Sequence, residues 1–184
     1  MKATGIVRRI DDLGRVVVPK EIRKTLRIRE GDPLEIYTDA EGGIILKKYS
    51  PIGELGDFAK EYAESLSKTS GHTACITDKN FIVAVSGASK KEYMEKPLSD
   101  QLEKVMDKRT DMIAKGAGDK TIDILSNEAS GKQYSSQAIA PIIAEGDSIG
   151  SVILFSTDPN ARMGDVEMKL VESAAGFLGR QMEQ

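Results

Sequence analysis

Two short segments near the N-terminus, 5–10 and 15–19, combine a strand-like composition with apolar residues on both faces. Alternate residues of a strand point to opposite sides, so each segment presents apolar side chains in two directions. The residues are Ile6 and Ile10 opposite Val7, and Val16 and Val18 opposite Val17. One hairpin cannot hide both faces, and a unit of about fifty residues without a disulfide or metal buries little apolar surface. The sequence therefore predicts an obligate homodimer, for which interleaved hairpins are one arrangement.

The rest of this first unit alternates strand and turn signals around one short helix. Pro19 ends the second strand because proline has no amide donor, and it can begin a helix over 20–26. The predicted order is strand 5–10, turn 11–14, strand 15–19, helix 20–26, loop 29–33, and strands 34–38 and 44–49 around a turn.

Charge is distributed unevenly along the chain. Residues 1–50 carry 11 Lys and Arg against 8 Asp and Glu, whereas the remainder carries 15 against 21. This asymmetry predicts an anionic partner for the N-terminal unit. On the predicted helix one face is basic and the opposite face is apolar, an arrangement equally typical of a solvated amphipathic helix. The basic residues are Lys20, Arg23, Lys24 and Arg27, and the apolar ones are Ile22 and Leu26.

The basic residues favour a nucleic acid as the anionic partner. Arg8, Arg9 and Arg15 lie on the neighbouring hairpin, and arginine suits phosphates and guanine edges. The first aromatic residue is Tyr37, whereas proteins that bind single strands stack bases on aromatic side chains. We therefore expect double-stranded DNA to be bound through Arg8, Arg9, Arg15, Lys20, Arg23 and Lys24.

The stretch TGIVRRIDDLGRVVVPKEIRKTLRIREGDPLEIYTDAEGGIILKKY strongly resembles the DNA-binding domain of AbrB-type transition-state regulators. The specific part of the match is the core D-x-L-G-R-V-V-[VI]-P. The resemblance implies a swapped-hairpin dimer that binds DNA through Arg8, Arg15 and Arg23. Lys24 stands where this family often has arginine, so the bidentate fork is lost and sequence preference can differ. With a second domain behind this one, the chain resembles a sporulation regulator of this family.

The second unit, from residue 51 on, combines helices with antiparallel strands. We expect a helix from 50 to about 70, strands 72–77 and 81–87, helical segments over 89–109 interrupted at Pro97, strands 121–125, 133–144 and 148–156, and a helix 164–182. The apolar stripes of the first and last helices either pack on their own sheet or extend to a subunit interface. In the second case dimers of the first unit join into a homotetramer.

The stretch AIAPIIAEGDSIGSVILFS (138–156) is similar to the final hairpin of GAF domains. The resemblance implies either a sensor of an unidentified small-molecule ligand or a purely structural domain. No cofactor and no cofactor-binding residue can be identified from the sequence. The fold class expected for the whole chain is α+β, with a GAF-like antiparallel sheet flanked by helices.

No catalytic or metal-binding residues are predicted. His72 and Cys75 are too few for a zinc site, and the segment 115–121 lacks the spacing of a phosphate-binding loop. Ser65 and Lys68 match a fragment of a serine-acylase motif without its partner motifs. A single cysteine, no signal peptide and no apolar run of membrane-spanning length favour a cytoplasmic, nucleoid-associated protein that does not bind a membrane.

The sequence thus predicts a transcription regulator of two domains, activator or repressor. Residues 1–52 are expected to bind DNA and dimerise, and residues 53–184 to sense a ligand or to oligomerise. Two rivals remain. One is an antitoxin that uses the same N-terminal fold to bind a toxin protein. The other is an enzyme built on the GAF-like domain, for which a chain with one Cys and one His offers little chemistry.

Overall fold

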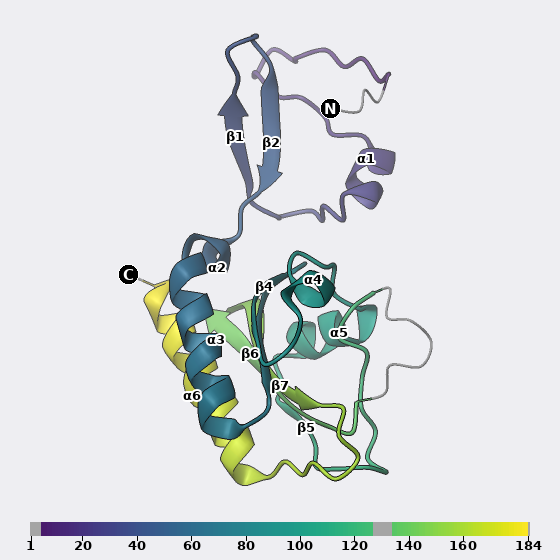
Figure 1. Cartoon of the computed structure of the whole chain (residues 1–184). Helices are drawn as coiled ribbons and strands as arrows, with labels where there is room; N and C mark the ends of the chain where they lie inside the picture. The colour runs from purple at the N-terminus through teal and green to yellow at the C-terminus, as the bar shows by residue number, and fades with distance from the viewer. Residues whose placement is uncertain (1–4, 127–133, 184) are drawn as a thin grey trace. The chain divides into compact units, whose positions relative to one another are not determined.

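The computed structural model describes residues 5–126 and 134–183, and the chain divides into two compact units, Met1–Tyr49 and Ser50–Gln184 (Figure 1). The division lies just before helix α2 (Pro51–Glu54), whereas the boundary expected from the sequence, after residue 52, falls inside that helix.

The first unit contains one short helix and one two-stranded antiparallel sheet. Helix α1 (Lys20–Thr25) follows Pro19, and strands β1 (Leu34–Thr38) and β2 (Ile44–Lys48) pair in a register that sets Tyr37 opposite Ile45. Asp39 holds the turn between the strands, because its carboxylate accepts the Gly43 N–H at 2.6 Å.

The segments 5–10 and 15–19, predicted as strands, form no ladder within the described part of this single chain. The backbone hydrogen bond from Asp11 N to Arg15 O, at 3.0 Å, closes the turn between them. The strand assignment is therefore wrong for one chain taken alone. A strand needs a hydrogen-bonded neighbour, and the composition of a segment does not supply one.

The first unit has no buried apolar core in its described part. Apart from Pro19, the buried apolar residues of the described chain begin at Ile52, whereas Val7 and Val17 of the first unit are 88% and 70% exposed. The basic helix is also shorter than predicted, since α1 ends at Thr25 and Arg27 adopts a positive φ of 52° beyond it. Leu26, on the apolar face of the predicted helix, is exposed.

The second unit is built on a five-stranded antiparallel sheet in the order β4-β3-β7-β6-β5. Helices α3 (Gly56–Ser70) and α6 (Asp165–Gln181) cover one face, and the smaller helices α4 (Lys90–Tyr93) and α5 (Asp100–Lys108) lie toward the other (Figure 1). The strands are β3 (Thr73–Asp78), β4 (Ile82–Ser86), β5 (Met112–Ala114), β6 (Ser136–Ala144) and β7 (Asp147–Ser156).

Most predicted elements of the second unit are present, with local differences. The single helix expected from 50 to about 70 is divided at Leu55 into α2 and α3. The segment 121–125 forms one isolated bridge, Leu125 with Leu98, and β5, which the sequence did not predict, pairs with β6 instead. Gln133, the first residue of the predicted strand 133–144, lies outside the described residues. The break expected at Pro97 separates α4 from α5, and Ser99 caps α5 by accepting the Leu102 N–H at 3.0 Å.

Each face of this sheet carries its own hydrophobic cluster. The cluster under α3 and α6 includes Ala63, Val152 and Ala174. The cluster on the other face contains large rings: Phe155 lies 5.3 Å from Tyr93 and 5.0 Å from Tyr134, centroid to centroid. All three rings are almost completely buried, so side chains fill this face of the sheet where the rings meet.

Candidate nucleic-acid interface

The turn 11–14 holds Arg15 in a defined position. The Asp11 carboxylate accepts the N–H groups of Leu13 and Arg15 through Oδ1, at 3.0 and 2.7 Å, and the Arg15 Nε–H through Oδ2 at 2.8 Å. Gly14 closes the turn with a φ of +76°, a conformation that glycine adopts at low cost. The guanidinium is thus tied at Nε on an otherwise exposed side chain.

The charge of Asp11 is stabilised by these contacts. The Arg15 backbone N–H and then its guanidinium hold the pKa of the Asp11 carboxyl below its ordinary value of 3.8. The carboxylate therefore remains ionised near neutral pH and keeps its attraction for the guanidinium. The role of Asp11 is not among those predicted from the sequence, although the spacing D-x-L-G-R, with a turn glycine between the two charges, could have indicated it.

Helix α1 presents the remaining predicted cations unequally. Lys20 and Lys24 are exposed, whereas Arg23 is half-buried and its Nε has no hydrogen-bond partner among the described residues. Pro19, the buried residue before the helix, fixes the direction in which α1 leaves the preceding segment. The Nε atom itself is buried, and a buried donor without a partner is unfavourable, so this nitrogen lacks an acceptor that the described residues do not supply.

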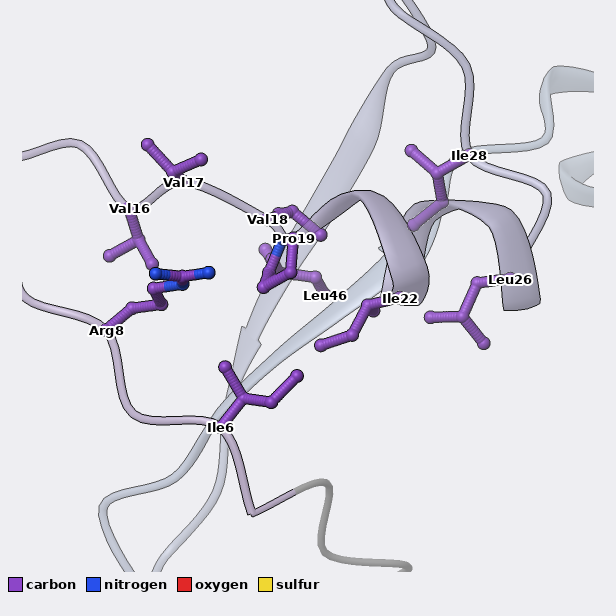
Figure 2. A pocket seen from close by; sticks show the side chains of 10 residues that line it. All are labelled: Ile6, Arg8, Val16, Val17, Val18, Pro19, Ile22, Leu26, Ile28 and Leu46. Carbon is purple, nitrogen blue, oxygen red and sulfur yellow. The ribbon is translucent and has the colours of Figure 1, made fainter.

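An apolar hollow of about 360 Å³ lies between α1, the segments 6–8 and 16–19, and strand β2. Its walls include Ile6, Val17, Ile22, Leu26 and Leu46, and Arg8 contributes its charged side chain. Figure 2 shows Arg8 beside Val16 in one part of the hollow and Ile22 and Leu26 of α1 in another. Side chains of the same chain leave this space open, although its lining is mostly apolar.

The single chain therefore gathers only part of the predicted DNA-binding set. Arg8 shares the hollow with the start of α1, Arg15 is held at the turn 11–14, and Arg9 is exposed. Two other cations have structural contacts: Lys48 lies 3.7 Å from the Asp32 carboxylate, and Lys47 lies over the Tyr37 ring at 4.7 Å.

An exposed aromatic cluster of the second unit is formed by Phe58 and Tyr62 of α3 and Phe177 of α6. The Phe177 ring stacks on Phe58 at 5.7 Å and on Tyr62 at 5.9 Å, centroid to centroid. Phe58 and Phe177 remain 37% and 36% exposed. Ala174 and Ala175 of the same helix are buried against their own sheet.

Other chemistry considered from the sequence has little support among the described residues. They contain no group of three potential metal ligands, and Cys75, the single cysteine of the chain, is buried. The loop that superficially resembled a phosphate-binding loop is closed on itself, since Asp119 accepts the Lys115 N–H at 2.7 Å. None of the helices in 5–126 and 134–183 combines the length and apolar character needed to cross a membrane.

Comparison with known proteins identifies both units. Residues 54–183 match the family model described as "Stage V sporulation protein T C-terminal, transcription factor", and residues 7–54 match "Antidote-toxin recognition MazE, bacterial antitoxin". Over its whole length, the chain is 57% identical to stage V sporulation protein T of Bacillus subtilis (strain 168), all of which is covered.

Two further relatives match one unit each. The transition state regulatory protein AbrB of Bacillus subtilis is 67% identical over 63 residues, which cover 31% of this chain and 65% of that protein. A GAF domain from an Acinetobacter phosphoenolpyruvate-protein phosphotransferase superposes with a TM-score of 0.57 at 10% identity, covering 74% of this chain and 84% of that one. These matches confirm the AbrB-type resemblance of the first unit and the GAF-like α+β fold of the second.

Proposed function

The chain belongs to the stage V sporulation protein T family of transcription factors, and on this premise we propose that it regulates sporulation genes by binding duplex DNA as a dimer of its first unit. Residues 1–52 supply both the dimer contacts and the DNA-binding surface. Residues 53–184 form the oligomerising, GAF-like part of the regulator.

The absence of a buried apolar core in the described part of the first unit carries the proposal for a dimer. Val7, Val17 and Ile36 are each at least two-thirds exposed, and the hollow beside α1 has apolar walls. Leaving this much apolar surface in water is unfavourable, and a second copy offers the same kind of surface. Interleaving two copies would give the segments 5–10 and 15–19 the ladder partners that one chain lacks.

The cations of the first unit support DNA as its partner. The first thirty residues carry 9 Lys and Arg against 4 Asp and Glu, in a chain of net charge −3. A two-fold axis doubles this charge and presents it twice, which suits the regular spacing of phosphates along a duplex. Arg8, Arg9, Arg15, Lys20, Arg23 and Lys24 are the proposed contacts. A regulator that binds DNA through these contacts would act at the nucleoid in the cytoplasm.

The exposed aromatic cluster of α3 and α6 is the proposed contact between dimers, which gives a homotetramer. Phe58 and Phe177 are apolar and partly exposed on neighbouring helices, so they form a continuous patch. We propose no enzymatic activity. Any small-molecule ligand of the GAF-like domain has to be accommodated by a sheet whose second face is filled around Phe155.

The salt dependence of DNA binding by the full chain tests this function. If each dimer neutralises about 5–8 phosphates, log K should fall against log salt concentration with a slope of roughly −4 to −7. Arg15→Ala and Arg23→Ala should each weaken binding at least about tenfold. Lys104→Ala, which removes an exposed positive charge from α5, is the control and should leave affinity unchanged. Binding that is insensitive to salt would refute the proposal.

An antitoxin is the second candidate, because residues 7–54 match the MazE family model. The observation against it is the second unit, which is a folded domain with two hydrophobic clusters rather than an extended toxin-wrapping segment. Limited proteolysis distinguishes the two: a regulator of this design leaves a resistant fragment spanning residues 53–184, whereas a toxin-wrapping segment is digested.

A further inference from the structure

We propose that Asp11 is a positioning residue for DNA recognition, which sets sequence discrimination by fixing the direction of the Arg15 guanidinium. This inference rests on the proposed DNA-binding function and adds to it a residue that carries the opposite charge from the six proposed contacts. Asp11 acts through Arg15 and does not itself contact the bases.

The geometry of the carboxylate separates two tasks. Oδ1 accepts the Leu13 and Arg15 N–H groups and so holds the turn, while Oδ2 accepts the Arg15 Nε–H at 2.8 Å. One residue thereby fixes both the backbone from which Arg15 starts and the orientation of its guanidinium plane. The Arg15 side chain is 69% exposed, so this contact, and not burial, restricts it.

A guanidinium held at Nε has both terminal nitrogens on its opposite edge. This edge is the one that donates two parallel hydrogen bonds to a phosphate or to O6 and N7 of guanine. Arginine has many rotamers, and an exposed one loses much of that freedom on binding. Because Asp11 has already restricted Arg15, the loss is smaller on binding, and a misaligned base is penalised because the side chain cannot swing to follow it.

The negative charge of Asp11 weakens DNA binding, whereas its orientation of Arg15 favours binding. A carboxylate beside a proposed phosphate or base contact repels DNA and cancels part of the arginine charge. Its removal should therefore keep or slightly raise affinity for an unselected duplex, while affinity for the selected duplex falls because Arg15 is no longer oriented. A carboxylate with only an electrostatic role would change the affinity for the preferred sequence and the affinity for other sequences by the same factor. The ratio of these two affinities therefore distinguishes a positioning role from an electrostatic one.

Asp11→Asn in the full chain tests the proposal, with Asp12→Asn as the matched control. Asparagine can still accept the backbone N–H groups of the turn, but its amide nitrogen cannot accept from Nε. Asp12 lies in the same turn, is exposed, and has no contact with an arginine among the described residues. Both variants remove one negative charge per chain from the same region, and thermal unfolding checks that both remain folded.

The probes are a duplex of about 20 base pairs that the wild-type chain selects from a randomised library, and a scrambled duplex of the same composition. For Asp11→Asn, affinity for the scrambled duplex should stay constant or rise up to about twofold, while the ratio of the two affinities falls roughly three- to tenfold. For Asp12→Asn the ratio should stay unchanged. An equal effect of both variants on the ratio would overturn the proposal.

A second pair of variants keeps the test independent of any change in the turn. In an Arg15→Lys background, which retains the charge but lacks Nε, Asp11→Asn should no longer change the ratio. A persistent effect there would mean that Asp11 acts on the turn alone and not through Arg15, and the proposal would be wrong. If the chain did not bind DNA at all, the wild type would select no duplex from the library. This outcome differs from a failure of the Asp11 proposal, in which the wild type still selects a duplex.

Discussion

Gly179 of α6 lies directly against the carbonyl group of Ile143 in β6: a Cβ built on this glycine would lie 2.1 Å from the Ile143 oxygen. The helix can approach the sheet this closely only because residue 179 has no side chain. The neighbouring Gly176, one turn earlier in the same helix, would place a Cβ in open space. Two glycines of one helix therefore have different physical roles.

Gly179→Ala should destabilise the second unit. The contact is with backbone, which cannot rotate away, so either the helix or the strand has to shift, at a cost of about 1–3 kcal/mol. Gly176→Ala is the matched control and should stabilise the unit by roughly 0.5–1 kcal/mol, since alanine is the better helix former. Urea unfolding of the two variants measures the difference, and equal stability would contradict the close packing.

Residues 1–52 expressed alone should be dimeric at every concentration at which they are folded. The described part of this unit has no buried apolar core, so folding has to be coupled to association. The melting temperature should therefore rise with protein concentration. Sedimentation equilibrium beside thermal unfolding measures both quantities, and a folded monomer would rule out the interleaved arrangement.

Phe177→Asp should convert a tetramer of the full chain into dimers that the first unit still holds. Phe177 is partly exposed and stacks on Phe58 and Tyr62, so an aspartate there would be desolvated at the interface without a partner. Phe81→Asp is the control, because Phe81 is similarly exposed, at 41%, but lies just before β4 and outside the aromatic cluster.

Light scattering gives the mass of both variants. DNA affinity of the Phe177 variant should also fall, since the linked chains lose one of two DNA-binding units. A Phe177 variant that remains tetrameric would exclude the aromatic cluster as the contact. A variant that unfolds would place this ring in the domain core, and the prediction would be wrong.

Asp111→Asn should slightly stabilise the second unit at neutral pH. Partial burial, and then the charge of Glu172, raise the pKa of the Asp111 carboxyl above 3.8. The folded chain thus binds this proton more tightly than the unfolded chain, and the ionised carboxylate costs stability. The wild type should regain that stability as the pH falls through the raised pKa toward 3.8, and its difference from the variant should shrink.

Two measurements check this pH dependence. Carboxyl-carbon NMR titration should show Asp111 titrating above an ordinary aspartate, and Glu172→Gln should move its midpoint down. Thermal unfolding at several pH values should show the full stability advantage of the variant above that midpoint, and an advantage that shrinks as the pH falls from the midpoint toward 3.8. An unchanged midpoint in the Glu172 variant would remove the electrostatic part of the explanation.

The sequence by itself determined the features that depend on local pattern. The periodicity of 164–182 predicted α6, observed as Asp165–Gln181, because one apolar stripe of this length is enough to specify a helix. The D-x-L-G-R-V-V core identified the AbrB-type unit. The apolar residues on both faces of the segments 5–10 and 15–19 predicted that this unit needs a second copy to bury them. Pattern reasoning also placed the break near Pro97, since proline interrupts a helix wherever it occurs inside one.

Tertiary structure decided the features that depend on contacts between residues far apart in the sequence, such as strand pairing and burial. Strand β5 exists because β6 offers it an edge, and three residues carry too little pattern to predict that. Burial of Ala174 against the sheet, and exposure of Phe177 one turn away, follow from how α6 rests on β6. The tie between Asp11 and Arg15 was also decided in space, because sequence spacing brings two charges near each other but does not orient a guanidinium.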